Sequence, residues 1–337
     1  YRWLLTVCPN GAALPIYQVF DNQLVVGIEF DPATGLGSPL HLIAPPGVPA
    51  LSYDVTGNVG TFLSAAIVNG KPASAQYDAS NGDLHYNRAN DVQGVSWIST
   101  VSVATAGNVG QYASLAVVNG FPAIAYHDVT NNRLMYVRAT NANGTAWGTP
   151  VVVDDPPGTT NVGQYNSLVV INGNPAIAYY DVSNGDLKYV RATDVNGTAW
   201  GTALTLDATG TTGQYLSMTV VNGNPAISYY DASTTDLRYI RASNANGGAW
   251  NTPVSVVATA NNTGQYTSMI VVNGNPAISY YNVTNQDLTY IRATNANGTT
   301  WGTEQVLATT GNTGLYTSMA IVNGTPAISF QDGGNQD

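Results

Sequence analysis

The sequence repeats itself with a period of about 50 residues. The segment from Gly163 to Asp181 returns with few changes from Gly213 to Asp231, and again from Gly264 and from Gly314. A fixed period in this range is typical of repeat architectures. We therefore expect a residue that returns in every repeat to build the repeat, whereas a residue found once is a candidate for function. The glycine of an Asn-Gly pair marks the period, with spacings of 50, 53, 50, 51 and 50 residues, at Gly70, Gly120, Gly173, Gly223, Gly274 and Gly324.

One repeat predicts four short antiparallel strands. Residues 164–171, 175–180, 187–192 and 200–206 are rich in Val, Leu, Tyr and other strand-forming residues, and turns with Asn, Asp and Gly separate them. Asn172-Gly173 between two apolar runs is a strong hairpin signal, because both residues of such a turn need a positive φ. None of these segments has the length or the period of a helix.

Four strands per repeat predict the blade of a β-propeller. A single sheet of this kind leaves two apolar faces uncovered, and stacked blades cover both. A β-solenoid fits less well, because its coils are usually shorter than about 30 residues. We expect an all-β fold, a single domain over residues 1–337 and seven blades of four strands. The expected repeats are approximately 1–47, 60–103, 110–153, 163–206, 213–256, 264–307 and 314–337.

The last repeat, 314–337, has only two expected strands. We therefore expect the last blade to be incomplete, and either a longer chain or two strands from elsewhere would finish it. The alternative is six complete blades plus an exchanged strand pair. An unpaired strand edge is a ready-made place for another chain to pair.

The low charge of the chain excludes several partners. Charged residues make up 9% of the sequence, and the formal net charge is −10. Nucleic acids and anionic membrane surfaces both need a basic face, so we expect neither as a partner. No apolar run reaches the roughly 18 residues that span a bilayer, and Cys8 is the only cysteine, which excludes an internal disulfide. The polar, lysine-poor composition favours an extracellular or cell-surface location.

The turn after the third strand carries a recognisable motif. Thr193-Asp-Val-Asn-Gly-Thr-Ala-Trp200 has counterparts ending at Trp147, Trp250 and Trp301. The motif resembles the Asp-box of sialidase-type propellers, Ser/Thr-x-Asp-x-Gly-x-Thr-Trp, although the Asp position holds Val195 here. The whole repeat is also similar to propeller repeats of large bacterial surface proteins. These resemblances imply a propeller blade with its hairpin at this turn, and they imply no defined activity.

Three kinds of repeated side chain are candidates for ligand binding: a Tyr in the first strand, an Arg late in the third strand, and the motif Trp. Arg side chains bind carboxylates and anionic glycans through two hydrogen bonds. The alternatives are structural, with Tyr side chains in the core and each Arg stacked on the Trp of its own hairpin, as Arg191 on Trp200. The candidate residues are Tyr112, Tyr165, Tyr215, Tyr266, Tyr316, Arg138, Trp147, Arg191, Trp200, Arg241, Trp250, Arg292 and Trp301.

Repeated acidic residues flank the turn between the second and third strands, as Asp181 and Asp186 do. Their oxygens suit calcium, but capping of the turn by Asp side chains explains the same residues. We favour capping and expect no metal and no cofactor. The repeated Asn-Gly-Thr sequons are likewise interpreted as turn chemistry rather than as glycosylation sites.

The sequence favours a non-catalytic protein. A glycosidase needs two carboxylates in different environments, and the one-off acids Glu29 and Glu304 lie in different repeats. The Tyr–Glu pair and three clustered arginines that the sialidase resemblance would require have no one-off counterpart. We therefore expect adhesion or binding of a glycan or surface protein at a bacterial surface. The alternative is a structural subunit that self-associates through the incomplete blade, and a sialidase-like hydrolase is the least favoured.

Overall fold

The computed structural model describes residues 57–158, 160–257 and 261–334, together with the backbone of five short strands nearer the N-terminus. The chain divides into two compact units. The first contains Leu51–Gly213 and Tyr1, and the second contains Arg2–Ala50 and Gln214–Asp337. Every regular element of the described residues is a β-strand. Within this part of the chain, no helix has the length and apolar character needed to cross a membrane.

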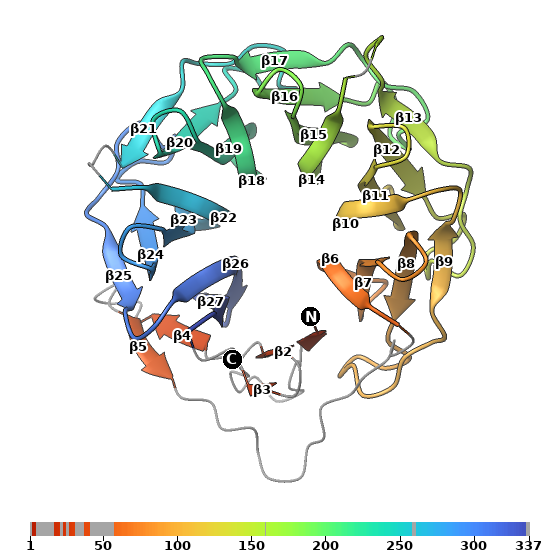
Figure 1. The fold of residues 1–337 in the computed structure, drawn as a ribbon, viewed down its shortest axis with the longest axis horizontal. Helices are drawn as coiled ribbons and strands as arrows, with labels where there is room; N and C mark the ends of the chain where they lie inside the picture. The colour runs from red at the N-terminus through yellow and green to blue at the C-terminus, as the bar shows by residue number, and fades with distance from the viewer. Residues whose placement is uncertain are drawn as a thin grey trace. The chain divides into compact units, whose positions relative to one another are not determined.

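The first unit holds three four-stranded antiparallel sheets whose strands follow one another in chain order (Figure 1). Strands a, b, c and d denote this order in each sheet. The first sheet contains β6 (Val59–Val68), β7 (Lys71–Asp78), β8 (Asp83–Arg88) and β9 (Val101–Ala104). The second contains β10 (Val109–Val118), β11 (Phe121–Asp128), β12 (Arg133–Arg138) and β13 (Val151–Asp154). The third contains β14 (Val162–Ile171), β15 (Asn174–Asp181), β16 (Asp186–Arg191) and β17 (Leu204–Asp207).

The second unit holds two more sheets of the same order and one of mixed origin. The first contains β18 (Thr212–Val221), β19 (Asn224–Asp231), β20 (Asp236–Arg241) and β21 (Val254–Val257). The next contains β22 (Thr263–Val272), β23 (Asn275–Asn282), β24 (Asp287–Arg292) and β25 (Gln305–Ala308). The last joins β26 (Thr313–Val322) and β27 (Thr325–Asp332) to β4 (Gly27–Phe30) and β5 (Gly37–Leu40). A three-stranded sheet contains β1 (Arg2–Leu4), β2 (Tyr17–Phe20) and β3 (Gln23–Leu24).

The last repeat supplies only two strands of its sheet, as expected, and the other two come from elsewhere in the same chain. Ile328 of β27 pairs with Ile28 of β4, and β4 pairs in turn with β5. The N-terminal part of the same chain therefore supplies the two missing strands, because the free edge of β27 offers unpaired N–H and C=O groups. The expected first repeat, 1–47, is divided between this sheet and β1–β3. Cys8 lies outside the described residues, and the number of blades and the single domain remain predictions.

The hairpin between strands a and b forms as the sequence predicts. Asn172 has a φ of 45° and Gly173 a φ of 82°, which are the left-handed values that the turn needs. Strand d is shorter than expected, because β17 begins only at Leu204. Trp200, predicted to open this strand, forms an isolated bridge with Ala192 instead, and its indole N–H donates to the Gly197 carbonyl at 3.0 Å. The motif turn therefore continues through Trp200.

The cores lie between neighbouring sheets within a unit. In the first unit, Leu134 and Tyr136 of one sheet pack with Ile177 and Tyr179 of the next in a single buried cluster. Strand b is buried on both faces, as its continuous run of buried residues shows. Stacking therefore covers the two apolar faces that a single sheet would expose.

A serine in strand a links each first strand to its neighbour. The Ser64 hydroxyl oxygen accepts a hydrogen bond from the Leu115 N–H at 3.0 Å, and Ser114 accepts one from Leu168 at 2.9 Å. In the second unit, Ser268 accepts the same bond from Met319 at 2.9 Å. These bonds hold neighbouring a strands side by side and satisfy N–H groups that an edge strand would leave unpaired.

Candidate ligand-binding site

The first strands carry two rows of stacked aromatic side chains, one row in each unit. In the first unit, the ring centres of Phe62 and Tyr112 are 4.4 Å apart, and those of Tyr112 and Tyr165 are 4.9 Å apart. In the second unit, the Tyr215–Tyr266 and Tyr266–Tyr316 distances are 4.5 Å and 4.4 Å. All of these rings are tilted relative to each other, by 46° to 56°. We call these two sets of three residues the aromatic rows.

Every member of the aromatic rows has a strained backbone. The φ values lie between 50° for Phe62 and 54° for Tyr112, in the left-handed region that bulky residues rarely adopt. The cause is a bulge in strand a, where the pairing of β10 with β11 shifts between Gln111 and Ser114. A bulge redirects the side chain at its extra residue. The bulge therefore turns each aromatic ring toward its counterpart in the neighbouring sheet.

The aromatic rows are partly open to solvent and are bordered by amide side chains. Phe62 is 38% exposed and Tyr316 45% exposed, and the other four members are half-buried. The Tyr112 hydroxyl donates to the Gln164 side-chain oxygen at 3.3 Å. Burial raises the pKa of Tyr266 above its usual value, and its hydrogen-bonded neighbours Tyr215 and Tyr316 raise it further. Its hydroxyl therefore stays protonated and able to donate.

A second layer of aromatic side chains from strand b supports the rows. Tyr165 lies 6.1 Å from Tyr180, and Tyr112 lies 6.3 Å from His127, measured between ring centres. The His127 ring bonds to the Asn161 side-chain oxygen at 2.9 Å. The hydroxyl groups of three strand b tyrosines also donate to an asparagine side-chain oxygen, and each asparagine lies directly before the first strand of the next sheet. These tyrosines are Tyr77, Tyr230 and Tyr281. These hydrogen bonds hold in place the strand b side chains against which the aromatic rows pack.

The repeated arginines hold the turn between strands a and b. Arg138 donates from Nε to the Val118 carbonyl at 2.9 Å and from Nη2 to the Asn119 carbonyl at 2.8 Å. Arg191 makes the equivalent bonds to Ile171 and Asn172. Arg241 and Arg292 repeat the pattern in the second unit. The expected stacking of Arg191 on Trp200 is therefore wrong, because the turn carbonyls orient the guanidinium group instead.

The motif tryptophans contact the preceding sheet. The Trp200 ring lies 5.2 Å from Tyr136 in an edge-to-face arrangement, and Trp147 packs in the same way on Tyr86 and Trp301 on Tyr239. Trp250 donates its indole N–H to the Gly247 carbonyl at 2.7 Å. These positions indicate a role in sheet stacking. Ligand binding by the Arg and Trp candidates remains a prediction that this geometry does not favour.

The repeated Asp residues cap the turn between strands b and c. Asp181 accepts from the Ser183 and Asn184 N–H groups, both at 3.1 Å, and from the Asn184 side chain at 2.9 Å. Capping by Asp side chains, the interpretation favoured from the sequence, is thus confirmed. Within the described residues, no group of three or more His, Cys, Asp or Glu is placed to hold a metal ion.

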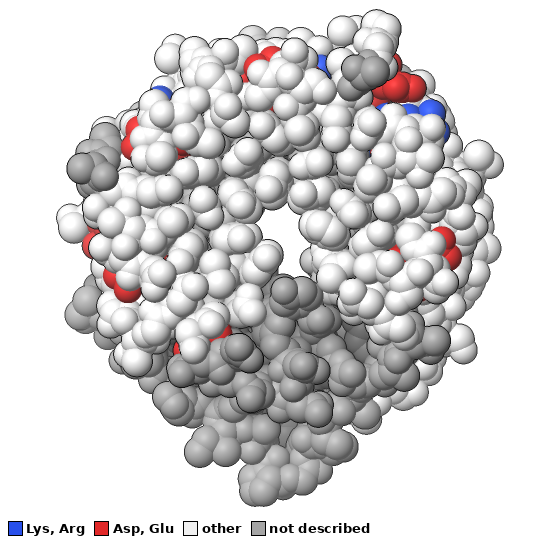
Figure 2. All heavy atoms as spheres, in the orientation of Figure 1, with Lys and Arg blue, Asp and Glu red and all other residues white. Residues whose placement is uncertain are grey.

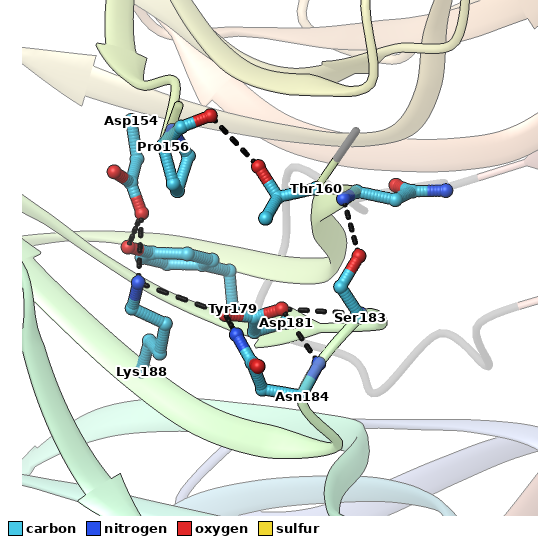
Figure 3. A network of polar contacts seen from close by, with 9 residues as sticks. Asp154, Pro156, Thr160, Tyr179, Asp181, Ser183, Asn184 and Lys188 are labelled. Carbon is cyan, nitrogen blue, oxygen red and sulfur yellow. Dashed lines mark hydrogen bonds and ion pairs between the residues drawn. The ribbon is translucent and has the colours of Figure 1, made fainter. Parts of the chain in front are cut away.

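A partly buried charge network links two sheets of the first unit (Figure 3). Lys188 lies 3.2 Å from Asp154 of the preceding sheet and 3.7 Å from Asp181 of its own sheet. The Tyr179 hydroxyl also donates to Asp154. Burial raises the pKa of Tyr179, and Asp154 raises it further. The network connects two sheets, and both carboxylates hold the Lys188 ammonium group.

Sequence reasoning missed two features of the site. Phe62 was not among the candidates, although it lies 50 residues before Tyr112 and the spacing of the repeat could have identified it. The role of Glu304, singled out as a one-off acid, is to accept a hydrogen bond from the buried Tyr280. No sequence signal connects that pair. The side chain of Glu29 lies outside the described part of the chain.

Comparison with known proteins identifies the fold. No family model and no curated protein matches the sequence. Among solved structures, the Hadza microbial sialidase Hz136 is similar with a TM-score of 0.56, 14% identity and coverage of 83% of this chain and 66% of that one. The NanB sialidase from Streptococcus pneumoniae is similar with a TM-score of 0.57, 8% identity and coverage of 82% and 65%.

The chain has a β-propeller fold like that of these sialidases. The identities are too low to carry more than the fold. The matched part of the propeller spans 66% and 65% of the two sialidase chains, so each of those proteins also contains structure outside the match.

Proposed function

We propose that this protein is a non-catalytic carbohydrate-binding propeller of a bacterial surface, and that the aromatic rows are its binding site. The seven-blade arrangement belongs to the same proposal. One observation carries it: the left-handed backbone of the row residues, together with the exposure of Phe62 and Tyr316.

The strain is the strongest indication of function. A bulky residue with positive φ costs about 1–3 kcal/mol, and such residues cluster at ligand sites. All six row residues have this unfavourable positive φ, which a regular strand would not require. A purely structural aromatic residue would be expected in the unstrained geometry that the rest of the strand adopts. The strain is better explained by the need to present the rings together.

The chemistry of the rows suits sugars. Aromatic faces carry a partial negative charge, and the C–H groups of a sugar ring carry a partial positive one, so the two pack together. The amide of Gln164 and the hydroxyls of the tyrosines add the hydrogen-bonding groups that sugar hydroxyls need.

The positions of the carboxylates favour binding over catalysis. Glycosidases place two carboxyl groups about 5–10 Å apart on either side of the scissile bond. The repeated Asp residues that follow strand b accept hydrogen bonds from turn N–H groups, as Asp181 does, and Glu304 accepts a bond from Tyr280. A hydrolase like the sialidases of similar fold is therefore the less favoured interpretation.

The alternative of a self-assembling structural subunit loses its main support. It depended on a free edge at the last blade, and β4 now occupies the edge of β27. The surface location rests on the low proportion of charged residues, 9%, and on the absence of a basic character that would suit nucleic acid.

The test is binding to a panel of polysaccharides by affinity gel electrophoresis. Two matched variants of β26 separate the site from its surroundings, because Tyr316 and Ile321 are 45% and 47% exposed on the same strand. We expect Tyr316→Ala to weaken binding by about tenfold, as for an aromatic anchor, and Ile321→Ala to leave it unchanged. Equal effects of both variants, or no retardation by any polysaccharide, would rule out the proposed site.

A further inference from the structure

We infer that the aromatic rows select neutral glycans and reject anionic ones. This inference rests on the proposed function and names the class of its ligand. An acidic sugar needs a charge-assisted hydrogen bond, which Arg and Lys supply best. The rows can offer such a charge-assisted hydrogen bond only if a basic side chain lies close to them.

The repeated arginines lie at the far end of strand a. Arg138 is bound to the carbonyl of Val118, six residues along the strand from Tyr112. At about 3.3 Å per residue, this places the guanidinium group roughly 20 Å from the aromatic ring along the strand. The remaining members, Arg88, Arg191, Arg241 and Arg292, make the same bonds at the same end of their sheets. Lys71 also lies at this end and donates to the Asn90 carbonyl.

The other three described cations are each paired with acids. Arg133 lies 3.1 Å from Asp128, and Arg238 lies 3.0 Å from Asp231. Lys188 contacts both Asp154 and Asp181. A ligand carboxylate would have to compete with these protein carboxylates for each cation. Of the ten Lys and Arg residues of the sequence, these nine are described, and only the side chain of Arg2 is not.

The two described histidines have partners within the protein. His85 lies 3.8 Å from Asp78, which offers it a partner within the protein. Burial lowers the pKa of His127, and its bond to Asn161 and the nearby Asp128 offset this only in part. His127 is therefore neutral at pH 7, beside Tyr112. His41 lies outside the described residues.

Acidic groups gather at the same end of the sheets as the rows. Asp128 pairs in register with Val109, at the start of the strand that carries Tyr112, and Asp181 pairs with Val162 in the same way. In the face that Figure 2 shows, the side chains over the a strands are uncharged, and charged side chains are visible farther from these strands, for example around β9, β13 and β17. With a formal net charge of −10, the chain repels an anionic ligand further.

The experiment compares neutral polysaccharides (dextran, galactan, arabinan, xylan) with anionic ones (polysialic acid, alginate, heparin) in affinity gels and in titrations at low and high salt. We expect binding to neutral members only, with an affinity that changes less than about twofold between 0.05 and 0.5 M NaCl, because no ion pair is screened. Phe62→Ala should weaken this binding by about tenfold, whereas the matched variant Ile67→Ala and the distant variant Arg138→Lys should not.

The outcomes separate the two proposals. Tighter binding of an anionic glycan that weakens with salt and is lost in Phe62→Ala would overturn the neutral selectivity while leaving the binding site in place. Anionic binding lost in Arg138→Lys and kept in Phe62→Ala would overturn both and move the site to the arginine end. Absence of any glycan binding would overturn the proposed function and this inference with it.

Discussion

The Tyr136 hydroxyl donates a hydrogen bond to the backbone carbonyl of Asn196, 3.0 Å away in the following sheet. Tyr239 donates to Asn297 in the second unit at the same distance. The motif turn of one sheet is thus held by a buried side chain of the sheet before it. This relationship explains why the Gly and Trp of the motif recur, since both contact the same tyrosine.

Gly197 gives the sharpest test of this packing. A Cβ atom at Gly197 would lie 2.6 Å from the Tyr136 ring, whereas one at Gly173 would meet nothing within 4 Å. Both glycines have positive φ, 74° and 82°. We expect Gly173→Ala to lower the free energy of unfolding by about 1–2 kcal/mol through backbone strain alone, and Gly197→Ala by about 3 kcal/mol or more through added overpacking. Urea unfolding of both variants measures the difference, and equal losses would contradict the docking of the turn.

Trp200 should contribute to stability rather than to binding. Its ring packs on Tyr136 and its side chain is half-buried. We expect Trp200→Ala to cost about 3 kcal/mol, near the low end for truncation of a large aromatic residue, with unchanged glycan affinity in the folded fraction. Thermal unfolding and affinity electrophoresis on the same sample provide the measurement. A loss of binding with a stability change below about 0.5 kcal/mol would place Trp200 in a site instead.

The Asp231–Arg238 pair should be energetically coupled. Their side chains lie 3.0 Å apart, and the next sheet replaces both partners at once, with Asn282 and Thr289 at the corresponding positions. We expect Asp231→Asn alone to cost about 2 kcal/mol, because it leaves a mostly buried guanidinium group without its carboxylate. Adding Arg238→Thr should recover about 1 kcal/mol. A double-mutant cycle by chemical unfolding gives the coupling, and strict additivity would contradict it.

His127 should make the fold sensitive to mild acid. Burial lowers its pKa below the usual 6.5, despite the opposing effects of Asn161 and Asp128. The unfolded chain therefore takes up a proton before the folded one does, so stability falls as the pH drops through 6.5 toward the lower folded value. The corresponding residue in the next repeat is Tyr180. We expect His127→Tyr to remove this part of the pH dependence between about pH 7 and 5. The measurement is the melting temperature as a function of pH, and identical profiles for the original protein and the His127→Tyr variant would contradict the assignment.

Much of the fold was predictable because the repeat presents each local signal several times. The Asn172-Gly173 turn and the capping Asp181 act through neighbours a few residues away, and sequence patterns record such local chemistry well. The strands of the last sheet were less predictable, because β4 and β27 lie at opposite ends of the chain and the N-terminal repeat has diverged.

The candidate site was predictable only as a list of residues. Tyr112 and Tyr165 occupy the same position in successive repeats, but their strained backbone depends on a bulge that no neighbouring Gly or Asn predicts. Arg191 and Trp200 were misread as a stacked pair because they flank one hairpin. Their actual partners, the Ile171 carbonyl and the Tyr136 ring, lie in other strands, one of them in another sheet. Periodicity identifies equivalent positions and leaves their contacts across sheets undetermined.

The pairing of Ile28 with Ile328 has a consequence for how the chain reaches its native state. Such a contact closes a loop of about 300 residues, and contacts of this sequence separation form late and slowly. During synthesis β4 and β5 are made long before β27, and β4 lacks its partner strand until β27 is complete. Formation of the last sheet therefore joins a strand that is synthesised early to one that is synthesised about 300 residues later. Removing β4 would uncover the edge of β27, and removing β27 would uncover the edge of β4.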